Sequence, residues 1–295
     1  MKDKIVWKFP NAIVSCEWLS KNLNNKNIRI YDCTTYLHYR DNDPSLPYLV
    51  ESGRKKYETS HIPHSSYIDL QSDLSDNNSP YRFTMPNLKV LSENFKKLGI
   101  GENFHIILYS RNGTQWSARI WWMLRSVGVD NVSILDGGFN EWIRIGLPTT
   151  DKLLEFPEAD FSFKPRNNIF VGKETIIESL EDKNTKILNS LTEDIYKGQN
   201  PRYGRPGRIP NSLNIPFHKL LDPKTGKFLQ IQELSKIFQQ NNIRYENNVI
   251  NYCGGGIAAS LEAFVLYQLG YQNLTIYDNS LSEWATDEDL PMEID

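Results

Sequence analysis

The chain has 295 residues, 39% of them hydrophobic and 12% aromatic, and a formal net charge of −3 at pH 7. This composition predicts one large or two ordinary globular domains, and the slightly negative charge argues against nucleic acid or an anionic membrane as a partner. Three widely spaced cysteines, no apolar run of membrane-spanning length and no signal-peptide pattern predict a cytoplasmic protein without a disulfide framework.

In chain order, the first half alternates short apolar strands with amphipathic helices. "IRIYD" (28–32) has the composition of a strand, and "SHIPHSSYIDL" (60–70) contains an Ile-Pro turn that leads into another. "LSENFKKLG" (91–99) has helical spacing. Residues 108–142 then predict a strand, a tight loop, a helix, a short strand ending in aspartate, and a turn before Glu-Trp. This alternation predicts an α/β domain with a largely parallel sheet.

The second half repeats the same order. "TKILN" (185–189), "GRIPNSLNIPF" (207–217) and "LSKIFQQNN" (234–242) match the three early segments. Residues 251–284 match the long strand–loop–helix–strand unit and are one residue shorter between the shared Tyr and Trp. Such internal similarity predicts two copies of one structural unit.

The repeat also predicts the domain boundaries. A segment rich in charge and proline separates the copies, and we interpret residues 151–167 as a linker. The expected domains are therefore 1–150 and 168–295.

The stretch "VINYCGGGIAAS" carries the clearest chemical signal. It predicts a buried parallel strand that ends at Cys253, then three glycines, then a helix from Ile257. Ligands of open α/β sheets bind at this edge, beyond the carboxyl ends of the strands. Glycines let successive N–H groups converge, and with a helix N-terminus they favour an anion. The pattern indicates a reactive Cys253 thiolate, or a persulfide on it, rather than a structural cysteine.

Other kinds of site find little support in the sequence. No CxxC is present, the five histidines show no ligand spacing, and no Gly-Lys-Ser/Thr follows the glycines. We therefore expect neither a metal nor another cofactor. Cys16 and Cys33 lack the strand–glycine–helix context, and we interpret them as core residues.

Together these motifs resemble a known family. "YCGGGIAAS", "GRIPNSLNIPF" and "YDNSLSEW" resemble the second domain of tandem-domain sulfurtransferases, the rhodanese and mercaptopyruvate sulfurtransferase family. "ARIWWMLRSVGVDNVSILDGGFNEW" resembles the first domain of that family. The resemblance implies two rhodanese-type α/β domains, an active site between them, and catalysis by the second domain alone. The repeat supports this asymmetry, because Ser110 stands where the second copy has Cys253 and a hydroxyl cannot form a persulfide.

The resemblance also implies a substrate-binding set around the Cys253 nucleophile. Its amide cradle is expected over Gly254, Gly255, Gly256, Ile257 and Ala258. Donor-binding side chains are expected at Arg82, which follows a Ser-Pro-Tyr turn, at Arg205 in the basic loop "NPRYGRPGR", and at Asp69.

Several donor-recognition residues of the family pattern are absent. Thiosulfate-type enzymes resemble Cys-Arg-Lys-Gly-Val-Thr and mercaptopyruvate-type enzymes Cys-Gly-Ser-Gly-Val-Thr, whereas Gly254 and Gly255 follow the cysteine here. Leu191 and Ile195 stand at positions of arginines in the pattern, and Phe83 stands at that of a histidine. The donor therefore stays open between thiosulfate, 3-mercaptopyruvate and another small sulfane compound.

The expected function is transfer of a sulfane sulfur through a Cys253 persulfide. The acceptor would be a thiol, cyanide or a thioredoxin-like protein, and we expect a monomer because one chain supplies both domains. A Cys-dependent phosphatase or arsenate reductase is an alternative, although Ala259 occupies the arginine position of Cys-x5-Arg. A sulfur carrier, redox sensor or scaffold without turnover would explain the missing arginines.

Overall fold

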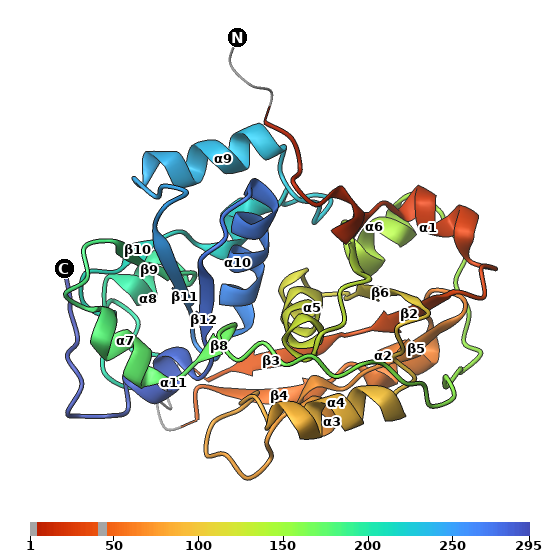
Figure 1. The fold of residues 1–295 in the computed structure, drawn as a ribbon, viewed down its shortest axis with the longest axis horizontal. Helices are drawn as coiled ribbons and strands as arrows, with labels where there is room; N and C mark the ends of the chain where they lie inside the picture. The colour runs from red at the N-terminus through yellow and green to blue at the C-terminus, as the bar shows by residue number, and fades with distance from the viewer. Residues whose placement is uncertain (1–4, 41–45) are drawn as a thin grey trace.

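Two parallel sheets of the same topology form the framework of the protein. The structure is a computed structural model that describes residues 5–40 and 46–295 (Figure 1). The first sheet has the order β1 (Ile13–Val14), β7 (Val132–Leu135), β6 (His105–Tyr109), β2 (Ile28–Asp32) and β5 (Ser65–Tyr67). The second has the order β8 (Phe170–Val171), β12 (Leu274–Tyr277), β11 (Asn248–Tyr252), β9 (Thr185–Asn189) and β10 (Leu213–Asn214). All pairings in both sheets are parallel, which confirms the predicted α/β class and the repeat.

Helices flank each sheet in corresponding places. The first half contains η1 (Pro10–Ala12), α1 (Cys16–Asn22), α2 (Arg54–Thr59), α3 (Leu70–Leu74), α4 (Leu88–Lys97), α5 (Gln115–Val127) and α6 (Gly138–Arg144). The second half contains α7 (Lys173–Ser179), α8 (Glu193–Tyr196), η2 (Phe217–Leu220), α9 (Ile231–Gln240), α10 (Ile257–Leu269) and α11 (Ser280–Trp284). Residues 151–167 form no helix or strand, and their role as a domain boundary stays a prediction.

The two halves also repeat individual side-chain contacts. Tyr109 Oη accepts a hydrogen bond from the Ile62 N–H at 3.3 Å, and Tyr252 Oη accepts one from the Ile209 N–H at 3.2 Å. Each tyrosine therefore ties the central strand of its sheet to the Ile-Pro turn seen in the sequence. Both tyrosines and both isoleucines are buried, so each hydrogen bond stabilises the contact between strand and turn in its own half.

An antiparallel hairpin of β3 (Thr35–Tyr39) and β4 (Tyr48–Ser52) occurs in the first half only. It extends from the first sheet towards the end of the second half where α11 lies (Figure 1). The sequence predictions did not include it. It brings first-half side chains to the edge of the second sheet where Cys253 lies.

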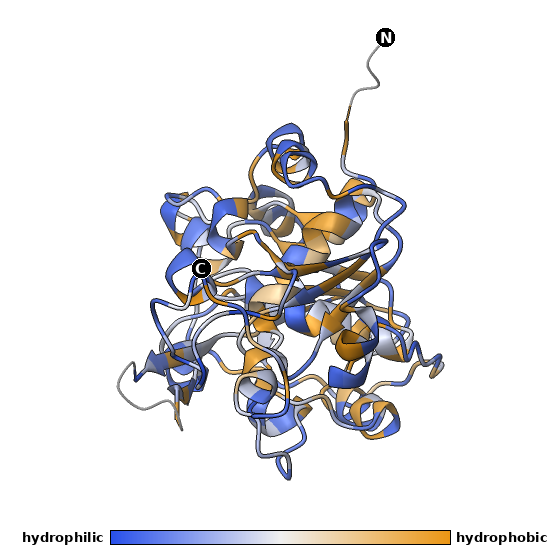
Figure 2. Ribbon diagram, turned by 90° about the vertical axis from the view of Figure 1, so that its left-hand side faces the viewer, coloured by the Kyte–Doolittle hydropathy of each residue, from blue (hydrophilic) through white to orange (hydrophobic). Residues whose placement is uncertain are grey.

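The core is continuous between the halves because α5 and α10 pack against each other at the centre of the molecule (Figure 1). Trp121 of α5 contacts Phe264 of α10 edge to face, with ring centroids 4.9 Å apart. The Trp122 indole N–H donates to the Ser260 carbonyl of α10 at 3.0 Å. Hydrophobic residues are concentrated in these central helices and strands (Figure 2). Trp121 and Trp122 are thus both core residues.

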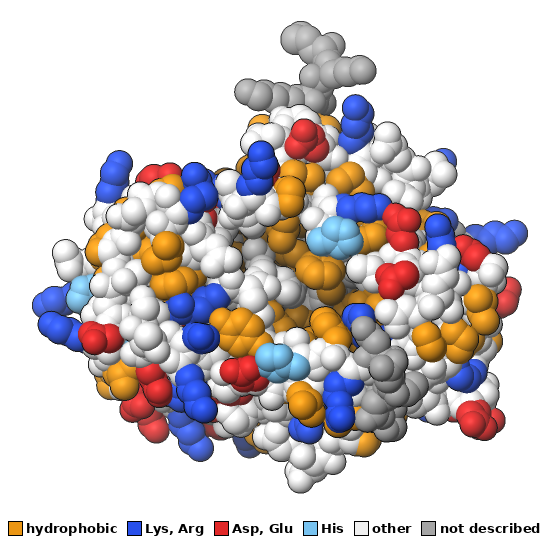
Figure 3. All heavy atoms as spheres, turned by 180° about the vertical axis from the view of Figure 1, so that it is seen from behind, with side chains coloured by type: hydrophobic (Ala, Val, Ile, Leu, Met, Phe, Trp, Pro, Cys, Tyr) orange, Lys and Arg blue, Asp and Glu red, His pale blue; other side chains and the backbone are white. Residues whose placement is uncertain are grey.

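The surface carries charges of both signs. On the face in Figure 3, acidic and basic side chains are interspersed, and hydrophobic side chains gather around a central hollow. In the described ranges, no helix has the length and apolar character needed to cross a bilayer.

Candidate active site at the Cys253 loop

Cys253 lies where the sequence predicts it, directly after β11 and just before α10. The residue is 3% exposed. Its N–H donates to Ser280 Oγ at 3.0 Å, and its carbonyl accepts from the Leu281 N–H at 3.1 Å. These two bonds fix the backbone of Cys253 against the start of α11.

The backbone after Cys253 presents unpaired N–H groups. The first N–H groups of any α-helix lack intrahelical partners, and no side chain caps those of α10. Among the described residues, no acceptor is bonded to the N–H groups of Gly254, Gly255, Gly256, Ile257 or Ala258. The helix N-terminus adds positive potential at the same place. The loop thus has the geometry of an anion cradle, and sulfur binding by these five residues stays a prediction.

The three glycines of the loop have different steric surroundings. A Cβ at Gly254 would lie 2.2 Å from Tyr203 Oη, so glycine lets that phenol reach the loop. Gly256 has a φ of +74° and lies against the Asp278 carbonyl, a backbone geometry that favours glycine. A Cβ at Gly255 would make only ordinary contacts, with Tyr48 Oη at 3.4 Å and the Arg82 carbonyl at 3.7 Å.

A cavity of about 190 Å³ opens at Cys253 between the two halves. Six aromatic side chains, four of them from the first half, line it: Tyr39, Tyr48, Phe83, Trp116, Tyr203 and Phe217. The other lining side chains, besides Cys253, are Leu37, Leu191, Asn112, Gln115, Ile257 and Ala258. No acidic or basic side chain occurs among the described residues that line this cavity. Burial raises the pKa of Tyr48 and of Tyr203, which keeps both phenols protonated.

A second cavity of about 340 Å³ adjoins the first, and Tyr48 and Tyr203 line both. Arg82 lines this neighbouring cavity together with Gln71, Ser282 and other residues. Its side chain therefore lies near the Cys253 cavity but does not line it. A donor-binding role for Arg82 stays a prediction.

Two residues of the expected donor set have other contacts. The Arg205 guanidinium donates to the carbonyls of Leu290 at 2.7 Å and Trp284 at 3.0 Å, and to two further carbonyls of the C-terminal segment. These bonds hold the guanidinium against the C-terminal segment, Arg205 lines neither cavity, and its donor-binding role stays a prediction. Asp69 caps α3 by accepting from the Gln71 N–H at 3.1 Å, and it lines neither cavity.

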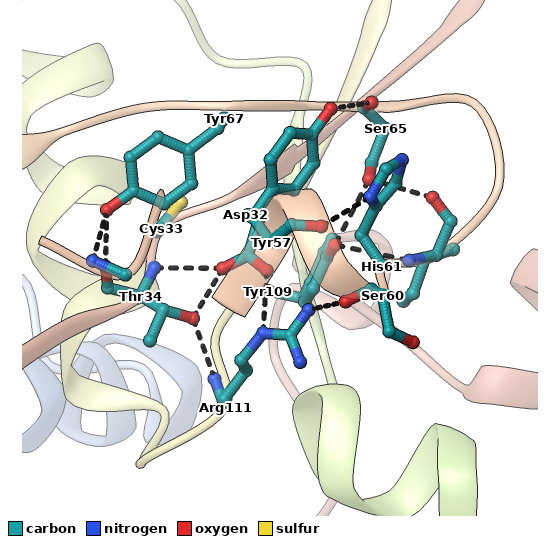
Figure 4. Close-up of polar contacts among 12 residues, drawn as sticks. Asp32, Cys33, Thr34, Tyr57, Ser60, His61, Ser65, Tyr67, Tyr109 and Arg111 are labelled. Carbon is teal, nitrogen blue, oxygen red and sulfur yellow. Dashed lines mark hydrogen bonds and ion pairs between the residues drawn. The ribbon is translucent and has the colours of Figure 1, made fainter. Parts of the chain in front are cut away.

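The corresponding loop of the first half is occupied by an ion pair. Arg111 Nε lies 3.1 Å from Asp32 Oδ2, and Figure 4 shows the same guanidinium reaching the Ser60 carbonyl. Thr34 donates to the other carboxylate oxygen of Asp32 from its N–H at 3.0 Å. Burial raises the pKa of Asp32, while Arg111 opposes that shift. Ser110 stands at the position that Cys253 has in the second half. This loop therefore has no thiol, and the Arg111 side chain occupies the space beside it.

Reciprocal hydrogen bonds hold the halves in register around the cavity. Asp278, after β12, accepts from the Met85 N–H at 2.7 Å and pairs with Arg119 Nη2 at 2.5 Å. Asp136, after β7, accepts from the Phe228 N–H at 2.9 Å. Each aspartate ends the same strand of its sheet and binds the other half. This arrangement positions the segment around Phe83 against the Cys253 loop.

The sequence pattern of the Rhodanese-like domain matches residues 15–145 and 174–287. The chain belongs to the rhodanese family. Human 3-mercaptopyruvate sulfurtransferase is 30% identical to it, over 96% of this chain and 95% of the human protein. Thiosulfate/3-mercaptopyruvate sulfurtransferase 2 of Arabidopsis thaliana is 29% identical, over 95% of this chain and 86% of that protein.

Solved structures show the rhodanese fold as well. The crystal structure of SseA from Escherichia coli, a 3-mercaptopyruvate sulfurtransferase homologue, superposes with a TM-score of 0.76 and 26% identity. The match covers 91% of this chain and 98% of SseA. The rhodanese fold, the tandem arrangement and a relationship to sulfurtransferase enzymes are thereby confirmed.

The sequence predictions missed most of the cavity walls. Tyr48 comes from the hairpin, and one signal pointed to that insertion: the first copy has a longer interval than the second between its early strand and the Ile-Pro turn. Tyr203 lies in the basic loop "NPRYGRPGR", where the sequence indicated Arg205 rather than the tyrosine as a site residue. Trp116 carried no recognisable signal, because its role depends on contact with the other half.

Proposed function

We propose that this rhodanese-family enzyme moves a sulfane sulfur from a small donor to a thiophilic acceptor through a persulfide on Cys253. One observation carries the proposal: a buried thiol ends a central strand and is followed by a run of unpaired N–H groups at a helix N-terminus. Such groups stabilise a thiolate and equally the terminal sulfur of a persulfide. The sulfurtransferase activity of the relatives supports the same assignment.

The first half-reaction forms the Cys253 persulfide. With thiosulfate, the Cys253 thiolate attacks the outer sulfur, the S–S bond of the donor breaks, and its electron pair leaves with sulfite. With 3-mercaptopyruvate, the C–S bond breaks and the thiol proton ends on the methyl group of pyruvate. Arg82 in the adjoining cavity is the candidate cation for the anionic group of either donor.

The second half-reaction regenerates the thiolate. Cyanide, a thiol or a thioredoxin-like protein attacks the terminal sulfur, the S–S bond of the persulfide breaks, and its electron pair returns to Cys253. Cyanide thus becomes thiocyanate. Both domains of the site come from one chain, so the proposal requires only a monomer.

Thiocyanate formation tests the proposal. Thiosulfate and 3-mercaptopyruvate are each assayed with cyanide, using the wild-type chain, Cys253→Ser and Cys33→Ala. Cys33 is a fully buried thiol outside the cavity and serves as the matched control. We expect activity in the wild type and the control and none in Cys253→Ser. A folded wild-type chain that is inert with both donors contradicts the proposal.

Intact mass spectrometry separates this enzyme from a carrier. A carrier holds one added sulfur on Cys253 but shows little steady-state turnover, and a scaffold shows neither. Hydrolysis of para-nitrophenyl phosphate that depends on Cys253 would instead support the phosphatase alternative.

A further inference from the structure

The walls of the Cys253 cavity point to the kind of molecule that enters it. Six aromatic rings and the side chains of Leu37 and Leu191 surround the nucleophile. Ligand sites with such walls bind mainly through buried apolar area, and flat rings pack well against aromatic side chains. The aromatic walls therefore favour a compact flat ring rather than a flexible polar chain.

Charge narrows the class of ligand further. Under the proposed function, the persulfide anion occupies the N–H groups of the loop once the donor has reacted. The described lining residues then offer no basic side chain to a second anion. Two basic side chains near this cavity lie outside its lining: Arg82 lines the adjoining cavity, where we place the anionic group of the donor, and Arg202 Cζ lies 4.0 Å from the centre of the Tyr39 ring. An acceptor carboxylate held in the Cys253 cavity itself would have no cation among the described lining residues and would lie close to the persulfide, which is unfavourable.

The size of the cavity agrees with a single ring. An apolar protein cavity of roughly 150 Å³ takes up benzene, and the Cys253 cavity measures about 190 Å³.

We infer that the sulfur acceptor of this enzyme is a thiol with one aromatic ring and no charged group besides its sulfur. The inference rests on the proposed persulfide and adds the class of acceptor. The acceptor thiolate attacks the terminal sulfur, forms an S–S bond and leaves as an aryl-bearing persulfide, while the Cys253–S bond breaks and Cys253 becomes a thiolate again. A second thiol releases that sulfur as hydrosulfide and leaves a disulfide, so hydrosulfide reports turnover.

The experiment uses the full chain and a matched pair of acceptors. Cys253 is loaded with inorganic polysulfide, and intact mass measures the added sulfur. Phenylmethanethiol is then compared with its para-carboxylate derivative, which has the same ring and reacting group, and with 2-mercaptoethanol, which lacks the ring. We expect kcat/KM for phenylmethanethiol to exceed each of the others by about tenfold or more.

A variant that adds a cation provides the reciprocal test. Leu191→Arg places a guanidinium in the cavity wall and should shift the preference towards the carboxylate by about tenfold. Leu191 is buried, so Gln115→Arg in the more exposed part of the wall is a second variant. Ile177→Arg, on the exposed side of α7, adds the same charge at a residue that lines neither cavity and should leave the preference unchanged.

The outcomes distinguish the two proposals. Failure to load sulfur on Cys253 overturns the persulfide and the acceptor class together. Successful loading followed by equal rates with the paired thiols overturns the acceptor class alone. The acceptor class is also overturned if Leu191→Arg and Gln115→Arg are folded and leave the ratio of kcat/KM values for the paired thiols unchanged.

Discussion

Gly254→Ala tests whether the glycine after the nucleophile is required by Tyr203. A Cβ at Gly254 would lie 2.2 Å from both Cζ and Oη of the Tyr203 ring, far inside van der Waals contact. Tyr203 is 5% exposed and packs edge to face on Tyr48, with centroids 6.5 Å apart, so the ring has little room to move. Forcing extra volume into such packing costs about 1–3 kcal/mol.

This cost has a measurable size. In domains of this length, each kcal/mol lowers Tm by roughly 2–4 °C, so we expect a fall of about 2–12 °C. Displacement of Tyr203 also deforms the cavity, and thiocyanate formation should drop with it. Thermal denaturation and the cyanide assay on the same preparations measure both effects.

Gly255→Ala is the matched control, because its Cβ would make contacts of only 3.4 and 3.7 Å. Neither glycine has a positive φ, so alanine suits the backbone at both positions. Gly255→Ala should leave Tm unchanged or raise it slightly, since alanine restricts the unfolded chain. Adding Tyr203→Ala to Gly254→Ala should remove the clash, which a double-mutant cycle detects. Equal Tm values for the two glycine variants would refute the reasoning.

Further predictions concern charged side chains. Arg82→Ala should raise the KM for anionic donors several-fold and leave Tm unchanged. Arg205→Ala should lower the free energy of unfolding by about 2–4 kcal/mol and leave KM unchanged, because it removes hydrogen bonds to buried carbonyls. The reverse pattern would support donor binding by Arg205. Burial raises the pKa of Glu262 from 4.5 to about 8, so the folded chain binds a proton that the unfolded chain has lost between these values. The free energy of unfolding therefore falls as pH rises through that window, and urea denaturation of Glu262→Gln should show a flatter curve; parallel curves would reject this origin. Arg119→Met should lower the free energy of unfolding, measured by urea denaturation, by about 3–5 kcal/mol because Asp278 stays buried without its cation. Adding Asp278→Asn to the same chain should recover part of this loss, whereas two independent sites would show additive losses.

Local patterns explain why the elements could be predicted. The helix predicted at 91–99 is α4, Leu88–Lys97, and it begins earlier because the Asn87 side chain caps the Lys89 N–H. The strand before Cys253 and the helix after it lie where spacing and glycines indicated. Periodicity and capping act over a few residues, so a single sequence contains this information.

The composition of the cavity could not be predicted in the same way. Tyr48 and Tyr203 are far apart in the chain, and both contact the loop after Cys253. Arg205 looked like a donor-binding cation because of its basic loop, yet backbone carbonyls of the C-terminal segment bind it. A charge in a sequence shows a capacity to bind, and only the fold shows which partner is nearest.

The sequence by itself determined the tandem α/β repeat, and it predicted Cys253 as the nucleophile and a first copy without catalysis, because each follows from local spacing or from the presence of a thiol. Only the tertiary structure decided what surrounds Cys253: an uncharged aromatic cavity with Arg82 in the adjoining space. The physical reason is that α5, α10 and the hairpin meet through packing between distant segments. That packing, rather than any local motif, determines which side chains face the sulfur.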